Sequence, residues 1–198
     1  MRLILASSNR GKLVEMRELL SGLEVELIPQ ADLGIGDADE IASTFVENAL
    51  LKARHAARAS GLAALGDDSG ICVDELGGAP GLYSARYAGA HGDAQANIAK
   101  LLHELRDVPD ARRAAHFYCV IVMLRSADDP MPLIAEGRWD GSILEAPRGN
   151  GGFGYDPLFL IPEYHRTFGE LSSRVKHALS HRGRAVAKLR PTLREIFR

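Results

Sequence analysis

This chain of 198 residues has little cysteine, no long apolar run and almost no net charge. Its two cysteines, Cys72 and Cys119, lie in no metal-ligand spacing, so we expect buried, reduced thiols and a cytoplasmic protein. A formal net charge of −2 argues against general binding to nucleic acid or to an anionic membrane. The longest apolar run, from Tyr118 to Leu124, is far below the roughly 20 residues that span a bilayer. The apolar start, Met1 to Ala6, is too short to predict a secretory signal.

Several common signatures are also absent from the sequence. The Walker A pattern G-x-x-x-x-G-K-[ST] does not occur, and no Ser-His-Asp or Cys-His arrangement can be defended from spacing. No repeat, low-complexity tract or linker divides the chain. We therefore expect residues 1–198 to form a single domain with two lobes.

Strands alternate with helices early in the chain and a meander follows, which predicts an α/β protein with a mixed sheet. Apolar runs predict strands at residues 3–6, 25–28, 63–66, 71–73, 114–124, 133–139 and 158–161. The strands at 114–124 and 133–139 are expected to be antiparallel neighbours. Periodicity and capping residues predict helices at 12–20, 44–61, 93–105, 171–179 and 182–197. Pro191 is expected to kink or break the last of these helices.

The most informative stretch is Gly151-Gly152-Phe153-Gly154-Tyr155-Asp156-Pro157. Three glycines in four positions let a backbone approach a ligand closely or fold tightly. Phe153 offers a ring face for stacking and Asp156 an acceptor for ring N–H groups, a combination that suits a flat heterocycle. Taken alone, the stretch is equally compatible with a glycine-rich hairpin whose aromatic rings pack into the core.

Ser7-Ser8-Asn9-Arg10-Gly11-Lys12 stands where the first strand passes into the first helix. The N–H groups and positive dipole at a helix start attract phosphate, and Lys12 adds a full charge. Serine and asparagine before a helix are more often plain N-caps, and this alternative stays open.

Asp67-Asp68-Ser69-Gly70 places two carboxylates side by side at a predicted strand end. A bound Mg²⁺ would relieve their repulsion and bridge to phosphate oxygens. The alternative is an Asp-rich tight turn with Gly70 at a positive φ. Glu40 could supply a further metal oxygen, and Lys52 could face the same phosphates, although a solvated helix lysine is the default interpretation.

Basic residues gather at Lys176, His181, Arg182 and Arg184. His181 and Arg182 could donate hydrogen bonds to a base carbonyl, since an arginine fork donates and cannot accept. A capped helix with exposed charges is the alternative.

With these segments in this order, the sequence resembles the inosine/xanthosine triphosphate pyrophosphatase family over almost the whole chain. Further marks of the resemblance are Thr44 to Ala49, Lys52 to Arg54, Leu76 to Arg86, Gly151 to Phe159 and Ser180 to Gly183. The resemblance implies an elongated mixed β-sheet with helical lobes flanking a substrate cleft, and a homodimer. It also implies Mg²⁺-dependent hydrolysis of ITP, dITP and XTP to the monophosphate and pyrophosphate. The chain departs from the family at Ser7-Ser8-Asn9, where Thr-Gly-Asn is common.

The resemblance also implies a role for each matched residue. Asp68 would be the general base and, with Glu40, a metal ligand. Ser69 would contact the substrate. The triphosphate would be held by Ser7, Ser8, Asn9, Arg10, Gly11, Lys12 and Lys52. The base would be held by Phe153, Gly154, Tyr155, Asp156, Lys176, His181 and Arg182.

Two other functions remain open from the residues. One is a related pyrophosphatase that acts on dTTP, UTP or modified pyrimidine nucleotides. The other is a non-catalytic nucleotide-binding module, and the pair Asp67-Asp68 speaks against it, because carboxylates that repel phosphate give a pure phosphate binder no advantage.

Overall fold

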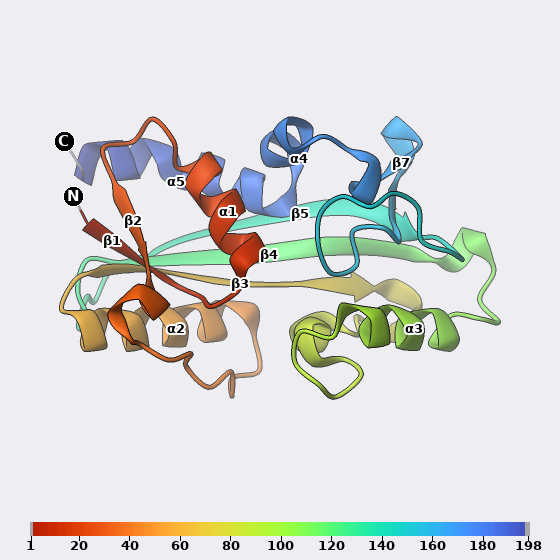
Figure 1. Ribbon diagram of the computed structural model, residues 1–198, viewed down its shortest axis with the longest axis horizontal. Helices are drawn as coiled ribbons and strands as arrows, with labels where there is room; N and C mark the ends of the chain where they lie inside the picture. The colour runs from red at the N-terminus through yellow and green to blue at the C-terminus, as the bar shows by residue number, and fades with distance from the viewer. Residues whose placement is uncertain (1, 197–198) are drawn as a thin grey trace. The chain divides into compact units, whose positions relative to one another are not determined.

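The computed structural model describes residues 2–196, which form a mixed α/β fold (Figure 1). The strands described are β1 (Arg2–Ala6), β2 (Glu26–Pro29), β3 (Ala63–Val73), β4 (Ala114–Leu124), β5 (Leu133–Ile143), β6 (Phe159–Ile161) and β7 (Arg166–Thr167). They follow the sheet order β2-β1-β3-β4-β5-β6-β7. β1 runs parallel to β2 and β3, whereas β6 runs antiparallel to β5 and β7. The predicted fold class, α/β with a mixed sheet, is confirmed.

The α-helices are α1 (Arg10–Leu19), α2 (Phe45–Ser60), α3 (Ala94–Glu104), α4 (Ser173–Leu179) and α5 (His181–Ile196). Among residues 2–196, no helix is long and apolar enough to cross a lipid bilayer. Cys119 is buried as expected, whereas Cys72 is only half-buried.

The described residues divide into two compact units. The first unit contains residues 2–68, 119–137 and 182–196, and the second contains residues 69–118 and 138–181. Strands β3, β4 and β5 contribute residues to both units. That the chain is a single domain with two lobes stays a prediction.

The sheet of the first unit is covered on both faces. Helices α1 and α5 lie on one face and α2 lies on the other (Figure 1). Leu3 and Leu5 of β1 pack into one apolar cluster, and Ile4 and Ala6 pack into another. Successive strand residues point to opposite faces, so a strand buried on both faces reads as an unbroken apolar run. This is why residues 3–6 lack the alternation of a half-exposed strand.

Small residues let α2 pack closely on β3. Thr44 caps the helix by accepting a hydrogen bond from Glu47 N at 3.3 Å, and Gly61 ends the helix in the left-handed conformation with φ 68°. A Cβ on Gly66 would lie 2.1 Å from the carbonyl oxygen of Ala49. Only glycine therefore allows this approach, which brings Lys52 of α2 next to the middle of β3.

The second unit has an aromatic core. Phe117 packs against Phe159 with ring centroids 4.6 Å apart, and Trp139 meets Phe168 edge-on at 4.8 Å. Leucines of α3 join the same cluster, and α3 begins at Asp93, whose side chain accepts a hydrogen bond from Ala96 N at 3.0 Å. The predicted cap at Asp93 is confirmed.

Two local predictions are wrong. Residues 63–66 and 71–73 belong to one continuous strand, β3, so Asp67-Asp68-Ser69-Gly70 is neither a turn nor a strand end. Gly70 has no positive φ; a Cβ there would lie 2.2 Å from Gly81 O, so glycine serves close packing. A break of α5 at Pro191 is also wrong, because the helix continues past Pro191 while Leu189 and Leu193 remain buried, and a kink there stays a prediction. The expected end of that helix at Phe197 lies outside the described residues.

Candidate active site

The two adjacent carboxylates lie in the middle of β3 and point to opposite faces of the sheet. Asp67 contacts Lys12 of α1 and Arg182 of α5, whereas Asp68 contacts Lys52 of α2. This division follows from the strand, because neighbouring side chains alternate between faces. The two carboxylates therefore have separate environments and do not compete for one partner.

Asp67 is held as a buried anion. Its Oδ1 lies 2.7 Å from Lys12 Nζ, and Arg182 donates from Nε to Oδ2 at 2.7 Å and from Nη2 to Oδ1 at 3.3 Å. Arg182 also pairs with Glu15, and the Cys119 thiol donates to Asp67 at 3.4 Å. Burial alone would raise the pKa of Asp67, but the charges of Arg182 and Lys12 hold that pKa well below its usual value. Asp67 is thus a permanent charge that fixes two cations.

The pKa of Asp68 is shifted in the opposite direction. Lys52 Nζ lies 2.7 Å from Asp68 Oδ1 and 2.5 Å from Glu40 Oε1. Burial raises the pKa of Asp68 even though Lys52 opposes this shift. The second oxygen, Oδ2, is buried and accepts no hydrogen bond from the described residues. One oxygen of Asp68 is therefore fixed by Lys52, and the other is a buried acceptor without a hydrogen bond from the described residues, the kind of atom that a water molecule or a cation satisfies.

The donor set of Asp68 fits a divalent metal only in part. Among residues 2–196, no three or more His, Cys, Asp and Glu side chains converge as a metal cluster. Mg²⁺, however, is commonly held by one or two carboxylates together with substrate phosphates and water. The Oδ2 atom of Asp68, which has no hydrogen bond from the described residues, suits that arrangement, and Glu40 pairs with the same lysine as Asp68.

The segment Ser7 to Lys12, which the resemblance predicts to bind phosphate and which is here called the phosphate loop, leads into α1. Asn9 is the N-cap, because its side chain accepts a hydrogen bond from Lys12 N at 3.1 Å. Ser7 Oγ accepts from Asn9 N at 3.2 Å, and Ser8 Oγ donates to Asp37 at 2.5 Å. Arg10 and Gly11 form the first turn of α1, with the Arg10 side chain exposed. The capping interpretation of Asn9 is confirmed, and the loop presents the positive end of a helix beside Lys12.

In the second unit, the glycine-rich stretch folds around Asp156. The Asp156 Oδ2 atom accepts from Phe153 N at 3.1 Å and lies 2.7 Å from Lys176 Nζ. A Cβ on Gly152, whose φ is 82°, would lie 1.9 Å from that oxygen. Gly154 also has a positive φ, 58°. Phe153 is 36% exposed as a residue, so a ligand could stack on its ring.

The other residues predicted to hold the base lie in different surroundings. The Tyr155 hydroxyl donates to Ser84 O at 2.9 Å, and its ring is buried in the core. His181 stacks on Phe117 with centroids 4.8 Å apart and an interplanar angle of 11°. Ser69 is half-buried in β3. Arg182 is 1% exposed and meets carboxylates of the first unit, so a contact with the base stays a prediction for this residue.

Three residues hold site side chains in place, a role that the sequence did not predict for them: Asp67, Glu15 and Asp37. The position of Asp67 beside Asp68 marked it as a candidate, but its partner Arg182 is 115 positions away, so the sequence did not predict their contact. Glu15 lies one helical turn after Lys12, a spacing that places both on one face of α1. No local pattern pointed to Asp37.

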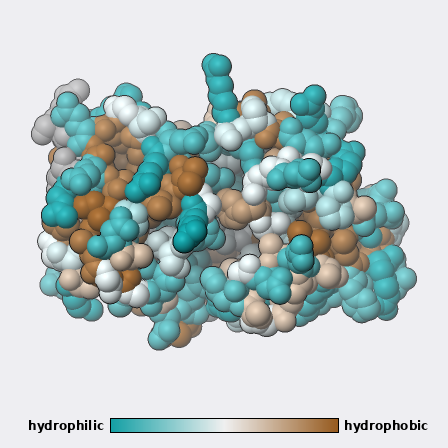
Figure 2. Space-filling model, viewed as in Figure 1, coloured by the Kyte–Doolittle hydropathy of each residue, from teal (hydrophilic) through white to brown (hydrophobic). Residues whose placement is uncertain are grey.

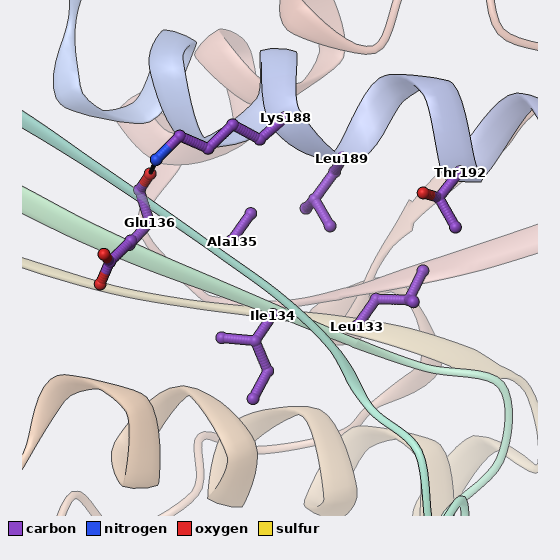
Figure 3. Close-up of a pocket in the computed structure, with 7 residues that line it drawn as sticks. All are labelled: Leu133, Ile134, Ala135, Glu136, Lys188, Leu189 and Thr192. Atoms are coloured by element: carbon purple, nitrogen blue, oxygen red, sulfur yellow. Dashed lines mark hydrogen bonds between the residues drawn. The ribbon is translucent and has the colours of Figure 1, made fainter.

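A further hollow lies apart from these clusters. It is a pocket of about 360 Å³ in the first unit, where β5 faces α5 (Figure 3). Lys188 spans it, donating to the carbonyl oxygen of Glu136 at 2.7 Å. None of the predicted site residues lines this pocket.

Paired carboxylates in a strand, two lysines and a capped helix start define an α/β enzyme that handles phosphate groups with positioned charge. The chain belongs to the Ham1 family, whose sequence model matches residues 3–192. This match, together with relatives named dITP/XTP pyrophosphatase, confirms the resemblance and the prediction of a nucleoside triphosphate pyrophosphatase.

Similar proteins cover nearly the whole chain. A dITP/XTP pyrophosphatase of Xanthomonas campestris pv. campestris (strain 8004) is 56% identical over 194 residues, covering 98% of each chain. A dITP/XTP pyrophosphatase of Salmonella typhimurium (strain LT2) is 51% identical over 193 residues, again covering 98% of each. Among solved structures, a HAM1 protein from Coxiella burnetii matches with a TM-score of 0.90 and 48% identity, covering 98% of this chain and 99% of that one.

Proposed function

We propose that this chain hydrolyses dITP, ITP and XTP to the monophosphate and pyrophosphate, with Mg²⁺, as a cytoplasmic homodimer. The observation that carries the chemistry is Asp68, a buried carboxylate with a raised pKa, one oxygen held by Lys52 and the other without a hydrogen bond from the described residues. The substrate assignment is supported by relatives that are named for dITP and XTP.

In the proposed reaction, Asp68 accepts a proton from the attacking water. The water oxygen bonds to the α-phosphorus, the bond from that phosphorus to the bridging oxygen of the β-phosphate breaks, and pyrophosphate leaves. A raised pKa brings the carboxylate closer to the operating pH, which favours a general base.

The phosphates are assigned to the first unit. The N-terminus of α1 presents N–H groups, and the ammonium of Lys12 is fixed by Asp67 at 2.7 Å. Mg²⁺ held at Asp68, with Glu40 as a second carboxylate, would neutralise charge that develops on the phosphates. Positioned charge is the main requirement of phosphoryl transfer, so no covalent nucleophile is needed.

The base is assigned to residues of the second unit. Phe153 offers an exposed ring for stacking, and Lys176 fixes the Asp156 carboxylate, an acceptor for ring N–H groups. The remaining candidates for the base are Gly154, Tyr155 and His181 of the second unit and Arg182 of the first.

Assembly as a homodimer is supported by the family resemblance and by exposed apolar residues. Apolar side chains gather on the surface of the first unit over β2 and α1 (Figure 2), and Val14 on α1 is 55% exposed. Light scattering in solution would then give twice the 21.5 kDa of one chain.

One phosphate-release assay tests the proposed function. ITP, XTP, ATP, GTP and dTTP are each incubated with enzyme and Mg²⁺, with and without inorganic pyrophosphatase. We expect phosphate from ITP and XTP only when inorganic pyrophosphatase is present, and no product after the metal is chelated with EDTA. Phosphate released from ITP without the coupling enzyme would contradict cleavage at the α-phosphorus. Preference for dTTP would favour a pyrimidine enzyme, and no turnover at all would favour a binding module.

A further inference from the structure

Asp37 links the phosphate loop to a distant part of the first unit. Its Oδ2 accepts a hydrogen bond from Ser8 Oγ at 2.5 Å, and its Oδ1 accepts from Gln30 Nε2 at 2.5 Å. Gln30 is 2% exposed and follows β2 directly, so one end of this bridge is fixed in the interior. Asp37 belongs to none of the residues assigned to the chemistry, the metal or the base.

The segment that carries Asp37 is itself anchored to α2. His55 of α2 lies 2.9 Å from the carbonyl oxygen of Gly36, the residue before Asp37. Further along, Glu40 pairs with Lys52 at 2.5 Å, and Asn48 accepts from Ala42 N at 3.0 Å. Asp37 is therefore a fixed acceptor, although its side chain is exposed to solvent.

The two serines of the phosphate loop make different hydrogen bonds: Ser8 donates one and Ser7 accepts one. Ser8 donates its one hydroxyl proton to Asp37, so it has no proton left to donate to a phosphate oxygen. Ser7 accepts a hydrogen bond from Asn9 N, a contact that does not use its own hydroxyl proton. A carboxylate next to a loop that receives a polyanion is electrostatically unfavourable, so its presence needs a compensating role. Holding the loop in place supplies that role.

We propose that Asp37 is a positioning residue that holds the phosphate loop, through Ser8, in the shape that receives the phosphates of the substrate. The proposal rests on the phosphate-binding role proposed above for Ser7 to Lys12. Because Asp37 acts on the loop and not on the reacting atoms, it affects binding of the phosphates and leaves the chemical step and the base contacts unchanged. A glycine in place of Ser8, as is common in the family, would have no hydroxyl for this bond.

The test measures inhibition of dITP hydrolysis by inorganic tripolyphosphate, a probe of phosphate binding, and by inosine, a probe of base binding. Asp37→Ala should weaken tripolyphosphate inhibition about three- to tenfold relative to Asp39→Ala, the range for loss of one hydrogen bond. Asp39 is exposed in the same segment, so its variant makes the same charge change without breaking the bridge. Inhibition by inosine should be the same in both variants. The KM for dITP should rise with tripolyphosphate inhibition while kcat stays within about twofold, as expected when uniform binding is lost.

Two further variants show whether Asp37 acts through Ser8. Ser8→Ala should reproduce the effect of Asp37→Ala, and the double variant should be no worse than either single one. Asp37→Asn should recover part of the loss, because its Oδ1 can still accept from Ser8. Additive effects of Asp37→Ala and Ser8→Ala, equal behaviour of Asp37→Ala and Asp39→Ala, or an equal loss of inosine inhibition would each overturn the proposal.

Lys12→Ala separates this proposal from the one on which it rests. Weaker tripolyphosphate inhibition in Lys12→Ala, without any change in Asp37→Ala, would overturn the positioning role alone. Unchanged inhibition in Lys12→Ala would overturn the phosphate-binding role of the loop and, with it, the role of Asp37.

Discussion

In this chain, the pKa of a side chain depends on its neighbours in the fold as well as on its residue type. Asp67 and Asp68 are neighbours in sequence, yet the pKa of Asp67 is lowered by Arg182 and Lys12 while burial raises that of Asp68. The difference arises because alternate side chains of β3 face different helices. One carboxylate therefore anchors cations, and the other is suited to accept a proton.

Replacing Asp68 by asparagine should reduce kcat for dITP by roughly two to four decades, the usual contribution of a general base. The amide keeps the size of the side chain but is no base. Lys52 keeps Glu40 as a partner, so the melting temperature should change little. Steady-state rates and thermal unfolding of Asp68→Asn, with Asp39→Asn as the control, would check this; turnover within a few-fold of the parent enzyme would remove Asp68 from the role of base.

Arg182→Ala should destabilise the protein by roughly 3–5 kcal/mol, because it leaves buried Asp67 with one cation in place of two. That loss corresponds to a fall in melting temperature on the order of 10 °C for a chain of this size. Arg194→Ala, at another exposed position of α5, is the matched control and should melt near the parent temperature. If both variants melt alike, the contacts of Arg182 with Asp67 and Glu15 do not stabilise the fold.

At the scale of elements, the site depends on how closely α2 approaches β3. The alanines of α2 are buried, and the absence of a Cβ at Gly66 allows the backbone of Ala49 to lie close to the strand. This approach sets the position of Lys52 beside Asp68. A substitution that increases the distance between α2 and β3 should therefore reduce both stability and activity.

Gly66→Ala should destabilise the protein by roughly 1–3 kcal/mol, since its Cβ would meet the Ala49 carbonyl oxygen at 2.1 Å and the helix would have to move. At Gly36, by contrast, an added Cβ meets nothing within 4 Å. Thermal unfolding followed by circular dichroism should show a lower midpoint for Gly66→Ala than for Gly36→Ala. Equal midpoints would mean that α2 is not held against β3 as tightly as this geometry requires.

At the scale of the whole molecule, the two compact units are not independent pieces of chain. Each is assembled from separate stretches, and β3, β4 and β5 contribute residues to both. Unfolding one unit removes part of strands on which the other depends. We therefore expect one cooperative transition.

The single tryptophan makes this expectation testable. Trp139 is buried in the aromatic core of the second unit, so its fluorescence reports on that unit, whereas far-UV circular dichroism reports on the helices of both. Urea titrations followed by the two signals should give the same midpoint and the same slope. Two separated midpoints would show that the units unfold one after the other.

The sequence alone determined the features that rest on neighbouring residues. The bounds of α2 follow from Thr44 and Gly61, whose capping preferences act within one turn of the helix, and the apolar run at residues 3–6 was enough to predict β1. The ordered motifs were enough to predict the family. Which partners the motif residues meet required the tertiary structure: Arg182 reaches Asp67 across 115 positions, and β3 stays a strand through two aspartates because distant lysines and an arginine satisfy them. Local propensity counts charged residues against a buried strand, and only long-range pairing supplies the interactions that offset their burial.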